Sequence, residues 1–190
     1  SEKLPFNWDI EMGRIFLVSL FILLNYNLFA SSGSNFILCK STYALCTTAL
    51  CKAIPEKKGM ASCKCDVKVN QYSVGTKPCT GVTKTKNGFV LSSRYSPISS
   101  YVSCQNSRPW AFCLDSPCLV DSQNPKIAFC LCTLVKNKGN YVIVTDHYNK
   151  NTCITGIYSS ATIKDVQQVT QFLKRHSELP PYPIKILNAR

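Results

Sequence analysis

The sequence is poor in acidic residues and in histidine. Its 190 residues include 10 Asp or Glu against 22 Lys or Arg, and only 2 His. It contains no Gly-x-Ser-x-Gly, no His-Glu-x-x-His, no phosphate-binding glycine loop and no Cys₂His₂ spacing. These absences exclude the motif-defined serine hydrolases, zinc proteases and P-loop nucleotide-binding proteins. They leave binding proteins, inhibitors and enzymes whose site follows no familiar motif.

The sequence also lacks an apolar run long enough for a comfortable bilayer span. The longest, over residues 15–30, is shorter than the roughly 20 apolar residues that a spanning helix needs. It is typical of a signal-peptide core, and Ala30 or Ser32 would be the last residue before cleavage. The acidic segment before Met12 is a poor signal start, so we interpret Met12 as the initiator. We expect a signal peptide over residues 1–32 and export to the periplasm or the extracellular space; the alternative is an uncleaved membrane anchor.

The basic residues form no run of five or six. The net charge of +12 attracts polyanions such as lipid head groups and acidic polysaccharides. Segments rich in lysine and aromatic residues, 84–89 and 147–151, are candidates for a polyanion-binding face. The alternative is an ordinary solvated basic surface. We expect an acidic surface or a protein as the partner, and no specific binding of nucleic acid.

Twelve cysteines lie after the signal segment. In an exported chain an even number of cysteines indicates disulfides, because the oxidising compartment lets them persist. The same residues in the cytosol would suggest a thiolate site for zinc or an iron–sulfur cluster, and that alternative stays open. We expect a disulfide framework with no cofactor and no metal. Its members are Cys39, Cys46, Cys51, Cys63, Cys65, Cys79, Cys104, Cys113, Cys118, Cys130, Cys132 and Cys153.

The cysteine spacing occurs twice. Four consecutive cysteines, beginning at Cys46, recur 67 residues later beginning at Cys113, and an aromatic–alanine pair precedes both sets. Each set also has a leading and a trailing cysteine. We interpret the pattern as an internal duplication of a six-cysteine unit. The predicted units span residues 33–86 and 87–158, and residues 159–190 follow them as a helix and tail.

Each unit contains a Cys-x-Cys in a segment of strand composition. Because side chains alternate across a strand, both cysteines of such a pair point to one face and can reach two partners on a neighbouring segment. The turn signal at 136–139, followed by a β-rich run, predicts a hairpin formed with the strand that comes after Cys132. A shorter version is predicted after Cys65. The expected fold is therefore β-rich and disulfide-stabilised, with two hairpin units and one C-terminal helix.

The spacing from Cys39 to Cys79 resembles that of epidermal-growth-factor-like modules. That family pairs the first cysteine with the third, the second with the fourth and the fifth with the sixth. The resemblance implies the bridges Cys39–Cys51, Cys46–Cys63 and Cys65–Cys79. The second unit departs from it, with 20 residues between its last two cysteines. Without the resemblance, 15 pairings per unit are open.

The segments around the units follow local patterns. Residues 89–95 and 99–103 are predicted as short strands separated by Pro97. Within 159–179, the apolar residues Val166, Val169, Phe172 and Leu173 lie three or four apart and predict an amphipathic helix. We expect it to be capped near Thr162, with Lys174, Arg175 and His176 at its C-terminal end. Residues 179–188 are predicted to end the helix and form a strand-like tail packed on the body.

Neither histidine is a persuasive catalytic residue. His147 follows Asp146, but consecutive residues of a strand point to opposite faces. His176 is more simply a cation at the helix end. Trp110 and Tyr43 are expected to pack against disulfides. The sequence favours an exported, non-enzymatic binding protein. An enzyme or protease inhibitor with an unrecognised site, and a thiol–metal protein, are the alternatives.

Overall fold

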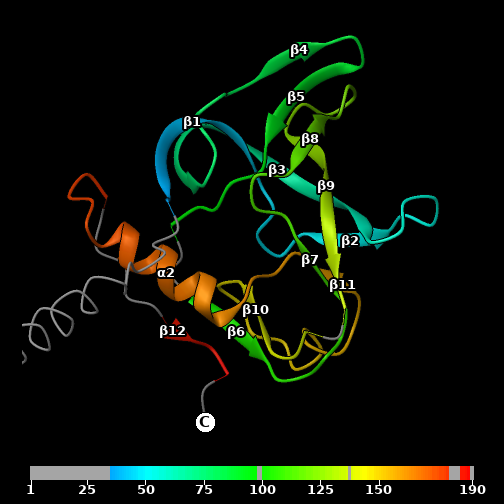
Figure 1. The fold of residues 1–190 in the computed structure, drawn as a ribbon, viewed down its shortest axis with the longest axis vertical. Helices are drawn as coiled ribbons and strands as arrows, with labels where there is room; N and C mark the ends of the chain where they lie inside the picture. Colours follow the sequence, from blue (N-terminus) through cyan, green and yellow to red (C-terminus); the bar gives the residue numbers. More distant parts are fainter. Residues whose placement is uncertain (1–34, 98–99, 137, 180–184, 189–190) are drawn as a thin grey trace, which may run out of the picture. The chain divides into compact units, whose positions relative to one another are not determined.

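A computed structural model describes residues 35–97, 100–136, 138–179 and 185–188 (Figure 1). These residues belong to one compact unit. The predicted signal peptide over 1–32 lies outside the described residues. Within them, no helix is long and apolar enough to cross a membrane. The predicted β-rich class is confirmed: twelve strands accompany a single helix in the described part of the chain.

The strands form two sheets. In the larger one, the order is β11-β2-β3-β9-β8-β5-β4, with β1 paired to β3 and β7 paired to β9; the smaller has the order β10-β6-β12. The larger sheet contains β1 (Ile37–Leu45), β2 (Leu50–Ala53), β3 (Met60–Gly75), β4 (Thr83–Thr85), β5 (Gly88–Ser92), β7 (Trp110–Phe112), β8 (Pro117–Val120), β9 (Ile127–Val135) and β11 (Ile157–Tyr158). The smaller contains β6 (Ser100–Cys104), β10 (Tyr141–Val144) and β12 (Lys185–Ile186), and the helix is α2 (Ile163–Leu173).

The centre of the larger sheet is the antiparallel pair β3–β9. Both Cys-x-Cys segments lie on these strands, as predicted, and Cys63 faces Cys130 in the register. These two cysteines are 67 residues apart, the interval of the repeat. Ala61 faces Cys132 and Cys65 faces Ala128, so the register is the same read from either strand. A local twofold axis therefore passes between Cys63 and Cys130.

The same relation extends over the two halves of the described chain, residues 35–97 and 100–161. We call residues equivalent when they hold the same register position in the two halves. Tyr43 faces Lys68 as Trp110 faces Val135. Thr48 and Asp115, 67 residues apart, both have positive φ, 56° and 54°. These two equivalent residues thus share backbone conformation as well as spacing.

The halves exchange strands. β5, from the first half, pairs with β8 of the second, and β11, from the second half, pairs with β2 of the first. Just after each exchanged strand the chain returns to its own half: parallel bridges join Ser93 to Ala44 in the first half and Ser159 to Ala111 in the second. Figure 1 shows β5 running beside β8. As a consequence, the two halves share one sheet and one buried cysteine core.

The predicted hairpins after the Cys-x-Cys segments are wrong. β9 does not pair with β10, which joins β6 in the other sheet, and β3 continues without a turn through Gly75. The hairpins are made instead with the preceding strands, β2–β3 and β8–β9. The turn signal at 136–139 does end β9. A turn signal, however, does not say which strand the following segment joins.

The predicted helix is confirmed, but it ends at Leu173 and its last turn holds none of the basic residues expected there. Of the predicted tail, residues 185–188 are described, and they include a short strand. Thr162 caps α2: its hydroxyl accepts from the Asp165 amide, and the Asp165 carboxylate accepts in return from the Thr162 amide. This capping box satisfies amides that would otherwise lack partners. The buried stripe of α2 packs on the smaller sheet, and the tail pairs with β6 through β12. The stripe consists of Val166, Val169 and Leu173.

Candidate interaction surface

All twelve cysteines are bonded in six disulfides. Both halves use the same nested order, first with sixth, second with fifth and third with fourth. The bridges are Cys39–Cys79, Cys46–Cys65 and Cys51–Cys63 in the first half, and Cys104–Cys153, Cys113–Cys132 and Cys118–Cys130 in the second.

The pairing implied by the resemblance to epidermal-growth-factor-like modules is therefore wrong. The physical cause of the observed pairing is the β2–β3 hairpin, which places Cys51 directly opposite Cys63. Cys65 lies on the same face of β3 and meets Cys46 on the segment before β2. The expectation that a Cys-x-Cys reaches two partners on one neighbouring segment is confirmed. That segment precedes the Cys-x-Cys strand.

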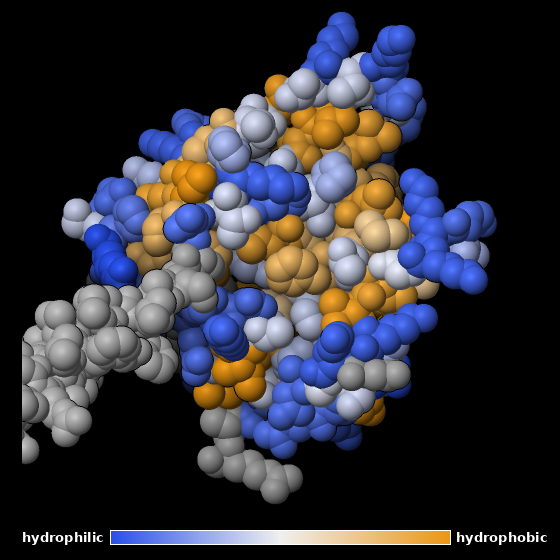
Figure 2. Space-filling view, in the orientation of Figure 1, coloured by the Kyte–Doolittle hydropathy of each residue, from blue (hydrophilic) through white to orange (hydrophobic). Residues whose placement is uncertain are grey.

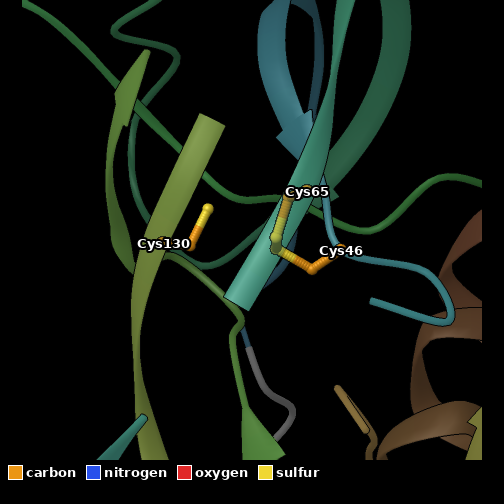
Figure 3. A group of neighbouring side chains, drawn as sticks. All are labelled: Cys46, Cys65 and Cys130. Atoms are coloured by element: carbon orange, nitrogen blue, oxygen red, sulfur yellow. A yellow bond between two sulfur atoms is a disulfide. The ribbon is translucent and has the colours of Figure 1, made fainter. Parts of the chain in front are cut away.

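Four cysteines form a row across the centre of the sheet. Cys51, Cys63, Cys130 and Cys118 face one another in turn on β2, β3, β9 and β8. Sulfurs of different bridges come close, and those of Cys63 and Cys113 are 3.5 Å apart. Figure 3 shows the Cys130 sulfur pointing toward the Cys46–Cys65 bridge. Sulfurs bonded in this way are not thiolates, so this cluster does not offer the ligands that zinc or an iron–sulfur cluster requires.

The other residues singled out in the sequence have ordinary surroundings. Trp110 is buried with Cys104 and stacks on Tyr141 with ring centroids 6.0 Å apart, which confirms its packing beside a disulfide. Tyr43 is buried and donates to the Tyr72 carbonyl. His147 lies in an irregular segment, and its ring is 3.4 Å from the Asp146 carboxylate. The prediction that these two point to opposite faces is wrong, because β10 ends before them.

A small cavity lies between the two halves. Equivalent residues line it from both sides, among them Cys46 with Cys113 and Ser93 with Ser159. Its volume is about 30 Å³, enough for about two water molecules. An enzyme site joining the two halves would require a much deeper pocket. The cavity is thus a packing feature of the interface between the halves.

Beside this cavity lies a buried ion pair that the sequence analysis missed. The side chains of Arg94 and Asp115 are 3% and 4% exposed, and their nearest charged atoms are 3.5 Å apart. Arg94 also donates to the carbonyls of Ile37 and Lys77 and to the Ser73 hydroxyl. Burial lowers the pKa of Arg94, and the Asp115 carboxylate opposes that shift. Arg94 lies in a serine-rich linker, where nothing in the local pattern distinguishes it from a solvated arginine.

Asp115 is held as firmly as its partner. Its carboxylate accepts from both the amide and the hydroxyl of Thr76, at 2.6 and 2.7 Å. The Lys77 ammonium donates to the Asp115 carbonyl. The ion pair therefore ties the end of β3 and the linker to the turn before β8. It links the two halves, its charged groups are all paired or hydrogen-bonded, and the cavity beside it is too small for a substrate.

The outer face of the larger sheet carries an exposed apolar row. Val90, Leu119 and Phe129 face one another in turn on β5, β8 and β9. Phe129 is 46% exposed and Leu119 is 42% exposed, whereas the alternating cysteines on the opposite face are buried. Figure 2 shows apolar residues gathered over the region of β5 and β8, with hydrophilic side chains around them. We call Val90, Leu119 and Phe129 the outer row.

Positive charge borders the outer row. Lys64 on β3 faces Phe129, and Lys52 lies on the same face of neighbouring β2. On the outer positions of β2, β3, β8 and β9 the one carboxylate is Asp66, and it is paired with Lys68 at 3.3 Å. The row is therefore apolar with an uncompensated cationic border.

Comparison with known proteins adds no relative: no protein-family model matches the chain, and neither the curated proteins nor the solved structures contain a match.

Proposed function

We propose that this chain is an exported, non-enzymatic interaction protein that binds an acidic protein partner through the outer row. The observation that carries the proposal is the exposure of Phe129 and Leu119 side by side on adjacent strands. Large apolar side chains that are exposed next to one another are typical of interaction sites in proteins. Aromatic residues at the centre of such a patch supply most of the binding free energy.

The charge around the row selects the partner. Lys64 and Lys52 would meet carboxylates at the rim of the interface, where charge speeds association and excludes other cationic surfaces. The chain as a whole carries a net charge of +12, which acts in the same direction at longer range. An apolar contact with an acidic rim is therefore the partner chemistry that fits.

Export and duplication complete the proposal. Six disulfides are typical of an oxidising compartment, which supports export. The identical bridge order and the twofold register support a tandem duplication of one six-cysteine unit.

In an ancestral dimer of single units, the exchanged strands would have been the contact between subunits. Leu119 and Phe129 have no apolar counterparts across the axis, since Lys52 is equivalent to Leu119 and Ser62 to Phe129. The binding face would then be a later specialisation of one side of the axis.

Photo-crosslinking in the protein's own host tests the proposal. A photoreactive phenylalanine replaces Phe129 on β9 in the full chain, and in a matched control it replaces Val69, an exposed apolar residue on β3. The expected result is an adduct with another protein from position 129 and none from position 69. Charge reversal by Lys64→Glu should remove most of the adduct, as should added salt.

Three results would overturn the proposal. These are equal labelling from both positions, an adduct insensitive to Lys64→Glu, and an adduct with lipid, polysaccharide or a second copy of this chain. Near-ultraviolet circular dichroism of each variant establishes that the disulfide core is unchanged.

A further inference from the structure

A second concave region lies on the smaller sheet, away from the outer row. Residues of β6, β12 and the segment after β10 line a groove of about 820 Å³. This volume is within the range of small-molecule binding sites. The lining residues are Ser103, Gln105, Tyr148, Lys150, Cys153, Ile186, Leu187 and Asn188.

The floor of the groove is braced. The Cys104–Cys153 disulfide ties β6 to the segment after β10, and the Asn106 side chain donates to the Cys153 carbonyl at 2.9 Å. On the other side, Asn188 both donates to the Ser103 carbonyl and accepts from the Ser103 amide. These contacts set the spacing of the groove walls before a ligand arrives, which lowers the entropy lost on binding.

The rim of the groove, in contrast, carries unengaged groups. Tyr148 is 54% exposed, and Gln105 and Lys150 are exposed as well. Within the described residues these three side chains make no hydrogen bond or ion pair, and no carboxylate lines the groove. The rim therefore offers an aromatic face, an amide and one uncompensated cation.

Two of these groups come from a segment without a counterpart in the first half. Twenty residues separate Cys132 from Cys153, whereas thirteen separate Cys65 from Cys79. The longer segment supplies both Tyr148 and Lys150. The groove is thus an addition to the framework that the two halves share, and the stability of that framework does not require it.

We infer that this groove binds an acidic saccharide with carboxylate groups, such as an oligouronate. The Tyr148 ring would pack on the apolar face of a pyranose, as aromatic side chains do when they present both an apolar face and a polar tip. Lys150 would pair with the carboxylate, and the Gln105 amide would exchange hydrogen bonds with ring hydroxyls. A site of this kind is independent of the outer row.

A peptide ligand fits the groove less well. Strand addition needs a free edge, and both neighbours of β6 are already in place, β10 on one side and β12 on the other. β12 itself spans two residues, too short a template for a further strand. Recognition here rests on side chains, which suits a sugar.

Calorimetric titration with trigalacturonate, against neutral galactotriose, tests the inference on the full chain. We expect the uronate to bind at least about tenfold more tightly than the neutral sugar. Tyr148→Ala and Lys150→Ala should each weaken uronate binding by about tenfold. The matched controls are Ile154→Ala, at an exposed residue just after Cys153, and Lys57→Ala, on the β2–β3 turn; both should bind like the unmodified chain.

Several outcomes would overturn the inference. No measurable heat at about 10 mM uronate would do so. Equal affinity for the two sugars, or an equal loss in the control variants, would do so as well. Equal binding of a triglutamate peptide would show that the groove responds to charge alone. Because Phe129 lies outside the groove, Phe129→Ser should leave uronate binding intact, which separates this site from the proposed protein contact.

Discussion

The two halves of this protein have the same framework and differ in what fills it. Ser73 and Gly75 on β3 hold the register positions that Tyr141 and Ile143 hold on β10. In the second half these positions carry large apolar side chains that are buried in a hydrophobic cluster. In the first half they carry small residues, and the Arg94 guanidinium occupies the space beside them.

The partner of that guanidinium differs across the axis in the same way. Asp115 is equivalent to Thr48, and Arg94 is equivalent to Ser160, so the ion pair exists on one side of the axis alone in the described chain. The disulfides and strand exchange thus act symmetrically, whereas charge and shape have diverged. Disulfides and strand pairing therefore determine the fold of both halves, and the side chains at the remaining positions can differ without changing it.

Removing a central bridge should have the largest effect. We expect Cys51→Ala/Cys63→Ala to lower the free energy of unfolding by about 2–4 kcal/mol, because each bridge restricts the unfolded chain. The equivalent variant Cys118→Ala/Cys130→Ala closes the same 12-residue separation and should cost the same within about 1 kcal/mol. Denaturant unfolding without reductant measures both. A loss of stability in only one of the two double variants would contradict the symmetric role of the bridges.

Breaking the ion pair should reveal the asymmetry. Asp115→Asn leaves the buried Arg94 without a counter-charge, and we expect it to lower the free energy of unfolding by about 3 kcal/mol. The matched control is Thr48→Asn, at the exposed equivalent position with the same positive φ, where asparagine is tolerated and the change should stay within about 0.5 kcal/mol. Equal effects at the two positions would show that the backbone, and not the charge, determines the cost.

The elements that could be predicted are those set by neighbours in the chain. Alternation around Cys63 and Cys65 predicts a strand, and the spacing from Val166 to Leu173 with a threonine before it predicts a capped helix. Pairing partners could not be predicted, because β5 joins β8 across the axis and a local pattern carries no information on that distant contact. The outer row was missed for a related reason. Leu119 and Phe129 become neighbours only when β8 pairs with β9.

The smallest effect is expected at Gly75, where the two halves differ most in size. A Cβ at this position would lie 2.3 Å from an Asp115 carboxylate oxygen and 2.7 Å from an Arg94 nitrogen, so Gly75→Ala must displace the ion pair. We expect a cost of about 1–2 kcal/mol in the free energy of unfolding, partly offset because alanine restricts the unfolded chain. The cost should vanish in an Arg94→Ser/Asp115→Thr background, which installs the residues found across the axis. Thermodynamic coupling between Gly75 and the pair, measured in a double-mutant cycle, is the diagnostic quantity. An unchanged cost in that background would mean that glycine is required by the strand itself. The first half would then owe its small residues to backbone demands and not to the arginine they accommodate.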